Sequence, residues 1–303
     1  MPTVISMENV VKRYGEQLAV NQLSFQLERG QILGLLGPNG SGKTTTIRLL
    51  NGVINPDGGN LRILGMDPQT QGGKIRAKSG VLTESAGLYE GMGAKQNLAF
   101  FAALYGLSDV EKRIDELLDD FGLSEANTKS VGAFSTGMKK RLGIARALLH
   151  KPEILYLDEP TSGLDPEGSR DLMRYIRDLN KQYGVTILIC THLLKQVQDL
   201  CHRFVFIDRG SLLEEGTLEE LEERHLGQVY VEVETPLVLS GGTYKRYPVT
   251  GRKPNYLVFQ LGDKEQIGNL LRSILEDAPV YGVNILGRDL EALYFKIRGD
   301  KDE

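Results

Sequence analysis

The chain has 303 residues, of which 41% are hydrophobic and 25% charged, and its formal net charge is -4 at pH 7. This length suits one large domain or two unequal ones, and the hydrophobic share is sufficient for a packed core. The small negative charge provides no global basic field, which argues against a general nucleic-acid binder, although a local basic patch stays open.

The two cysteines and the apolar runs exclude further classes. Cys190 and Cys201 have neither the spacing of a metal site nor the number needed for a disulfide framework. The amino terminus lacks an apolar signal core, and no stretch reaches the ~20 apolar residues that cross a bilayer. If the protein works at a membrane, we expect a partner chain to hold it there.

The first informative element is a strand, a loop and a helix between residues 31 and 53. QILGLL predicts a buried strand, GPNGSGKT a glycine-rich loop, and TTTIRLLNGV a helix. Such a loop directs backbone N–H groups and the positive end of the helix at an anion, Lys43 can reach the β- and γ-phosphates, and Thr44 can offer its hydroxyl to Mg²⁺. The predicted ATP-binding residues here are Gly37, Pro38, Asn39, Gly40, Ser41, Gly42, Lys43, Thr44 and Thr45.

The segment from about 85 to 151 differs from its flanks. Its apolar residues, among them Leu98, Phe101 and Leu104, recur at helical spacing with few strand signals. We therefore predict an inserted helical lobe. The flanking parts, residues 1–84 and 152–225, predict alternating strands and helices around a mostly parallel sheet, that is, an α/β domain.

Two further strands end in polar side chains. EILYLDE ends in Asp158, suited to hold Mg²⁺ through its water shell, and Glu159, placed to polarise a water for attack on the γ-phosphate. VTILICTH ends in His192. A lone histidine at a strand end is more often structural, but strand ends on this side of a P-loop sheet collect at the ligand crevice, so His192 is a candidate donor to the γ-phosphate or the attacking water.

After about residue 226 the pattern changes to short alternating strands, VYVEVET and YLVFQLG, then a helix, KEQIGNLLRSILED, and a strand, VYGVNILG. We predict a small α/β accessory domain over residues 226–303. A dimerisation or regulatory surface and a stabilising lid without separate activity are both open for it.

The phrases FSTGM, LDEPTSGLDP and TH, from residue 134 to 192, resemble the ATPase subunit of ABC transporters, and the resemblance covers residues 1–225. In that family two nucleotide-binding domains close head to tail around two ATP molecules. The resemblance implies that Ser135 and Gly137 contact the γ-phosphate bound by the partner copy. It also implies that Tyr14 stacks on adenine and that Asp165 links the two sites.

One position departs from that family's pattern. After the strand GVLT, where most members have a glutamine that touches Mg²⁺ and the lytic water, this chain has Glu84. A carboxylate can still ligate Mg²⁺, so we count Glu84 with Thr44 and Asp158 as a metal-site candidate, although it adds negative charge beside the γ-phosphate.

The resemblance implies an ATP-hydrolysing subunit that uses Mg²⁺ and drives an exporter from the cytoplasmic face of the cell membrane. Catalysis would depend on Glu159, His192 and Lys43. Its partners would be separate transmembrane subunits and a second ATPase subunit, identical or different, and no nucleic acid. The alternative is a soluble ATP switch of the same superfamily that acts on ribosomes or DNA, but those proteins usually have two cassettes or a long coiled-coil insertion, and this chain has one cassette and no basic tract.

Overall fold

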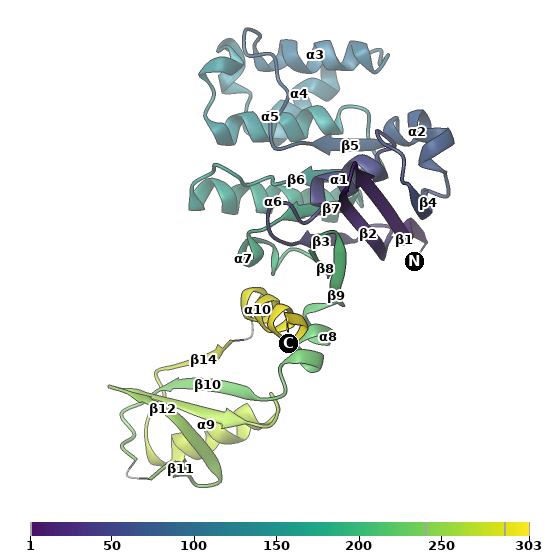
Figure 1. The fold of residues 1–303 in the computed structure, drawn as a ribbon. Helices are drawn as coiled ribbons and strands as arrows, with labels where there is room; N and C mark the ends of the chain where they lie inside the picture. Colours follow the sequence, from purple (N-terminus) through teal and green to yellow (C-terminus); the bar gives the residue numbers. More distant parts are fainter. Residues whose placement is uncertain (1, 240, 288, 303) are drawn as a thin grey trace. The chain divides into compact units, whose positions relative to one another are not determined.

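A mostly parallel sheet organises the chain up to Gly216 (Figure 1). The computed structural model describes residues 2–239, 241–287 and 289–302. The strands of this sheet are β3 (Ile32–Leu36), β5 (Ser79–Leu82), β6 (Ile154–Asp158), β7 (Thr186–Thr191), β8 (Arg203–Asp208) and β9 (Ser211–Gly216). Their order is β5-β6-β7-β3-β8-β9, and every neighbouring pair is parallel except β8 with β9. The predicted sheet type is confirmed.

A second, antiparallel sheet covers part of the first. Its strands are β1 (Thr3–Tyr14), β2 (Gln17–Glu28) and β4 (Gly58–Ile63), in the order β2-β1-β4. Leu33 and Leu35 of β3 share one hydrophobic core with residues such as Val10 and Leu23 of this sheet. Because side chains alternate along a strand, Ile32 and Leu36, which are also buried, face the opposite side. The central strand is thus covered on both faces, as its unbroken apolar sequence predicts.

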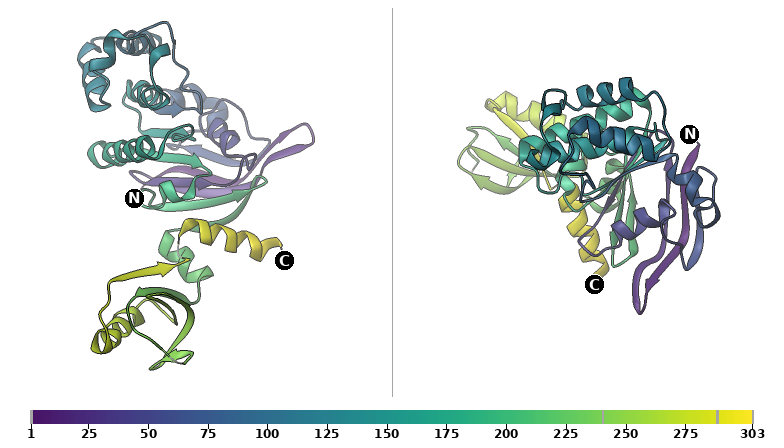
Figure 2. Two further views of the ribbon diagram at one scale, coloured as in Figure 1. Left: turned by 90° about the vertical axis from the view of Figure 1, so that its left-hand side faces the viewer. Right: turned by 90° about the horizontal axis from the view of Figure 1, so that it is seen from above.

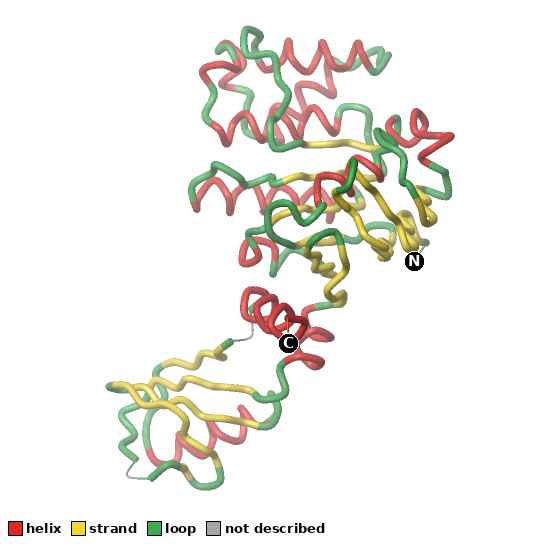
Figure 3. Tube along the Cα trace, in the orientation of Figure 1, coloured by secondary structure: helices red, strands yellow, loops and turns green. Residues whose placement is uncertain are grey.

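Helices fill the connections of this first unit, and their bounds are α1 (Lys43–Leu50), α2 (Pro68–Arg76), α3 (Ala94–Leu104), α4 (Glu111–Asp120), α5 (Thr136–Leu148), α6 (Pro166–Tyr183) and α7 (Leu194–Val197). Between β5 and β6 the described chain has α3, α4, α5 and two short 3-10 helices, Glu125–Thr128 and Val131–Ala133, and no named strand (Figure 3). These helices gather on one side of the unit in both views of Figure 2. The inserted helical lobe predicted for residues 85–151 is present.

Glu153, just before β6, joins two other segments of this unit. Its carboxylate lies 2.6 Å from Lys78 Nζ and 2.8 Å from Arg29 Nη2. These hydrogen bonds, with Lys78 contributing most, lower the pKa of Glu153. Its stabilising contribution is therefore fully present above the unfolded-state pKa and is lost as the pH falls through the lower, folded-state pKa.

We expect Glu153→Gln to lower the free energy of unfolding at pH 7 by about 0.5–1 kcal/mol. The loss is small because the ion pairs of Glu153 with Lys78 and Arg29 are partly exposed and therefore screened by solvent. Urea unfolding at pH 7 and at pH 3 checks this, since the difference between variant and wild type should shrink at the lower pH. High salt should also reduce the difference at pH 7. An equal difference at both pH values would contradict an ionic contribution.

The second compact unit begins at Thr217. The sequence pattern predicts this boundary at residue 225, but helix α8 (Leu218–His225) belongs to the second unit in the structure. The other elements of this unit are β10 (Val229–Glu234), β11 (Thr243–Tyr244), β12 (Tyr247–Lys253), β13 (Tyr256–Leu261), α9 (Gln266–Asp277), β14 (Gly282–Leu286) and α10 (Leu290–Asp302).

The strands of the second unit form one antiparallel sheet in the order β11-β12-β13-β10-β14. Val231 and Val233 of β10 pack with Leu270 and Ile274 of α9 in its core. Strands β11 and β12 are not predicted by the sequence pattern, because most of their residues are polar or exposed and their apolar alternation is weak. Within the described ranges, no helix of either unit combines the length and apolar character that a membrane crossing requires.

Candidate nucleotide site

Three adjacent strands of the parallel sheet bring the predicted site residues together. β6, β7 and β3 are neighbours, so the loops that follow Asp158, Thr191 and Leu36 leave the same edge of the sheet. A cavity of about 470 Å³ opens there, a size suited to a small-molecule ligand. Its lining residues are Tyr14, Gln17, Ala19, Asn39, Gly40, Gly42, Lys43, Thr44, Thr45, Glu84, Asp158, Glu159, Ser162 and His192.

The glycine-rich loop between β3 and α1 has a backbone that other residues cannot easily adopt. Gly42 has φ +102°, and a Cβ atom there would collide with the carbonyl oxygen of Ala19. A Cβ atom at Gly37 would collide with the carbonyl oxygen of Ile207. Helix α1 starts directly after Gly42 without a side-chain cap. The N–H groups of its first turn are thus suited to bind an anion at the mouth of the loop.

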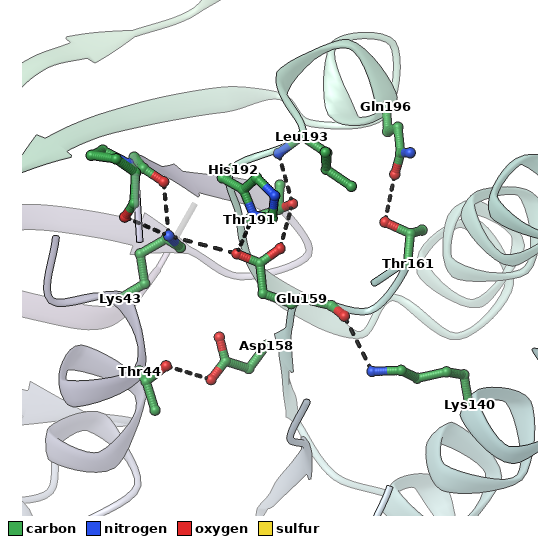
Figure 4. A network of polar contacts seen from close by, with 12 residues as sticks. Lys43, Thr44, Lys140, Asp158, Glu159, Thr161, Thr191, His192, Leu193 and Gln196 are labelled. Atoms are coloured by element: carbon green, nitrogen blue, oxygen red, sulfur yellow. Dashed lines mark hydrogen bonds and ion pairs between the residues drawn. The ribbon is translucent and has the colours of Figure 1, made fainter. Parts of the chain in front are cut away.

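Lys43 is held inside this loop. Its side chain is only 6% exposed, and its Nζ donates to the carbonyl oxygens of Gly37 at 2.8 Å and Pro38 at 3.0 Å. The same Nζ lies 3.6 Å from Glu159 Oε1. Figure 4 shows the ammonium between the loop and the end of β6. A cation fixed at this point can bind a phosphate without first being ordered.

Thr44 and Asp158 meet across the cavity. The Thr44 hydroxyl donates to Asp158 Oδ2 at 2.8 Å, whereas Asp158 Oδ1 is buried and has no hydrogen-bond partner. An unpaired buried carboxylate oxygen beside a hydroxyl fits a divalent cation such as Mg²⁺. Among the described residues no three His, Cys, Asp or Glu side chains group to hold a metal. A Mg²⁺ ion here would therefore take most of its ligands from phosphate and water.

Burial raises the pKa of Asp158, the Thr44 hydrogen bond opposes this, and the charge of Glu159 adds to it. Because the folded-state pKa lies above the unfolded value, ionised Asp158 destabilises the fold, increasingly as the pH rises between these two values. We expect Asp158→Asn to raise the melting temperature of the nucleotide-free protein at pH 7 by about 2 °C, the shift that roughly 1 kcal/mol produces in a domain of this size.

Differential scanning calorimetry at pH 7 and at acidic pH checks this prediction. The gain in melting temperature should disappear below the unfolded-state pKa of the aspartate, where both proteins are neutral at this position. Added Mg²⁺-ATP should stabilise the wild type more than Asp158→Asn. A variant that is less stable than wild type at pH 7 would contradict the electrostatic argument.

Both carboxylate oxygens of Glu159 have a partner in the site. Its Oε2 accepts from Thr191 Oγ1 at 2.9 Å, and its Oε1 lies 3.0 Å from His192 Nδ1. The glutamate side chain is 12% exposed and that of His192 is 41% exposed. The histidine is therefore positioned between the carboxylate and solvent. Thr191 was not predicted from the sequence, because a threonine at a strand end has many ordinary roles; its place before His192 is the only signal.

Glu84 and Tyr14 reach the same cavity from other elements. Glu84 follows β5 and lines the cavity next to Asp158, whose pKa its negative charge also raises. Tyr14 ends β1, and the residue is 44% exposed. The ring is thus available for stacking. Gln17, Ala19 and Ser162 also line the cavity and were not predicted.

Ser135, Gly137 and Asp165, all within the described part of the chain, do not line the cavity. Ser135 caps α5 and accepts a hydrogen bond from Met138 N at 3.2 Å. Asp165 caps α6 and accepts from Gly168 N at 2.8 Å. Within one chain Ser135 and Asp165 thus cap the starts of α5 and α6, and Gly137 lies in the first turn of α5. Gly37, Pro38 and Ser41 of the loop are also outside the lining, and Ser41 is buried.

The known proteins that this chain resembles in sequence and structure include several ATP-binding proteins of transporters. A family model described as "ABC transporter" matches residues 20–162. The bacitracin transport ATP-binding protein BcrA of Bacillus licheniformis is 42% identical over 225 residues, 74% of this chain and 73% of that protein. The linearmycin resistance ATP-binding protein LnrL of Bacillus subtilis is 32% identical over 98% of each chain. A solved structure of an ATP-binding subunit of an ABC transporter superimposes with TM-score 0.66 at 30% identity, covering 73% of this chain and 93% of that one.

Proposed function

The chain belongs to the ATP-binding subunits of ABC transporters, and on that premise we propose that it hydrolyses ATP to drive export of a drug or antibiotic through separate membrane subunits. The names of two relatives, for bacitracin transport and linearmycin resistance, support this substrate class. Since these names concern transport and resistance, we do not propose the alternative of a ribosome or DNA switch. The working place would be the cytoplasmic face of the cell membrane.

The observation that carries the proposed chemistry is the placement of Glu159 at the mouth of the phosphate-binding loop. Its carboxylate is fixed by Thr191 and His192 and lies 3.6 Å from Lys43. A carboxylate held this way can take a proton from a water as that water attacks the γ-phosphate. Lys43 and the N–H groups of α1 would bind the phosphates, and His192 would donate to the γ-phosphate or the water.

Mg²⁺ fits the pair of Thr44 and Asp158, with Glu84 as a further candidate ligand in the same cavity. When bound, it supplies positive charge that neutralises the phosphate oxygens. The ring of Tyr14, exposed at the cavity, would stack on the adenine. Each of these roles follows from a residue that already lies at the cavity.

For Ser135, Gly137 and Asp165 we propose roles in a head-to-tail dimer. In such a dimer the start of α5 in one copy would contact the nucleotide held by the other copy, with N–H groups at a helix start directed at phosphate. Asp165 would link the two sites. This agrees with their position outside the cavity of their own chain.

Mixing two inactive variants tests this arrangement. Lys43→Met disables the phosphate loop, and Ser135→Arg disables the start of α5. Each variant alone should be inactive, whereas an equal mixture should recover about a quarter of the wild-type rate, because half of randomly formed dimers are mixed and each mixed dimer has one complete site. Mixed dimers that form with Mg²⁺-ATP but stay inactive would refute the head-to-tail site.

A further inference from the structure

Lys140 in α5 is a buried cation that the chemistry above does not use. It is 4% exposed, and its Nζ donates to two main-chain carbonyl oxygens, Glu84 O at 2.6 Å and Glu159 O at 3.2 Å. Figure 4 shows the second contact. Burial lowers the pKa of Lys140, while the charges of Glu84, Asp158 and Glu159 oppose that shift. A lysine seldom occupies such a position unless its ammonium is bound on several sides.

The carbonyl that Lys140 holds belongs to a strained residue. Glu159 has φ +47°, in the left-handed region that non-glycine residues seldom adopt. Its N–H donates to Cys190 O at 2.8 Å, and its C=O also accepts from Ser162 N at 3.2 Å. Lys140 therefore provides one of the hydrogen bonds that keep this backbone, and with it the carboxylate, in place.

The other carbonyl belongs to the segment after β5. Arg146, also in α5, donates to Val81 O at 3.2 Å and Gly87 O at 2.9 Å, on either side of Glu84. Two cations of one helix thus hold three carbonyl groups, one in β5 and two in the segment that follows it. Only Lys140 extends the connection to the end of β6.

We propose that Lys140 is a positioning residue for ATP hydrolysis, which ties the backbone of Glu84 and Glu159 to the helix that starts after Ser135. The inference rests on the proposed function and deepens it. A helix is stiff, so a displacement of its start is passed to the residues bound by Lys140. Contact between the start of α5 and the nucleotide held by the other copy would then set the position of Glu159 in the same chain as that helix.

Lys140→Met tests the proposal, because methionine has a similar length but neither charge nor donors. We expect kcat to fall about 10–100-fold, as for a catalytic group displaced by up to 1 Å. Binding of a non-hydrolysable ATP analogue should change by less than about threefold, because the phosphate loop is untouched. Lys140→Gln, which keeps N–H donors, should give an intermediate rate. Lys139→Met is the matched control: the neighbouring lysine pairs with Glu90 at 2.7 Å, and its variant should behave as wild type.

Hydrogen exchange of the nucleotide-free protein provides a readout apart from activity. In Lys140→Met we expect faster amide exchange confined to residues 81–87 and 158–163, and no such change in Lys139→Met. This readout can be taken even if the wild type does not hydrolyse ATP. Failure of the proposed ATPase function can therefore be distinguished from failure of the positioning role of Lys140. A wild-type kcat with wild-type exchange would overturn the proposal, and so would exchange raised uniformly over the first unit. If Lys140→Met does not fold, the same measurements on Lys140→Gln decide.

Discussion

Glu159→Gln is expected to lower the rate of ATP hydrolysis by about 10²–10⁴-fold, the usual contribution of a general base. Glutamine has the same shape, and its amide oxygen can still accept from Thr191, but it cannot take a proton from water. Nucleotide binding should therefore persist. If hydrolysis reopens a closed dimer, the variant should accumulate as a dimer with Mg²⁺-ATP.

Single-turnover hydrolysis and light scattering of the purified chain measure these two effects. Glu153→Gln is a matched control, because it makes the same substitution just before the opposite end of β6, at a residue that does not line the cavity. It should retain the wild-type rate. Hydrolysis by Glu159→Gln at the rate of this control would exclude Glu159 as the base.

Gly42→Ala is expected to have the largest effect on both stability and nucleotide binding. The added Cβ would collide with the carbonyl of Ala19 at a backbone φ of +102°. We expect a loss of roughly 2–4 kcal/mol in the free energy of unfolding, from overpacking and the left-handed backbone together. Nucleotide affinity should fall by at least about 100-fold, because several oriented N–H donors would move away from the phosphates.

Gly40→Ala separates the effect of overpacking from the effect of the left-handed backbone. Gly40 has φ +80°, but a Cβ atom there would meet nothing within 4 Å. Its substitution should cost only the conformational part, about 1–2 kcal/mol. Chemical denaturation and equilibrium binding of ATP measure both variants. Equal losses in the two variants would show that the contact with Ala19 does not matter.

Several features were readable from the sequence because they depend on short, local patterns. The order strand, GPNGSGKT and helix predicted the phosphate loop, and the helical spacing after residue 85 predicted the inserted lobe. The resemblance carried by FSTGM and LDEPTSGLDP is confirmed by the relatives. The antiparallel sheet and the strands β11 and β12 were missed. In that sheet β4 pairs with β1, which lies far earlier in the chain, and in β11 and β12 the hydrophobic alternation is weak.

Residue type and spacing alone specify which groups are available for phosphate chemistry: the loop glycines, a lysine and the strand-end carboxylates. The contacts that hold these groups arise in the folded protein. Thr191 orients Glu159 and Lys140 binds its carbonyl because three separate elements, β6, β7 and α5, meet at one edge of the sheet. Hydrogen bonds between such segments depend on packing in three dimensions, which no local pattern specifies.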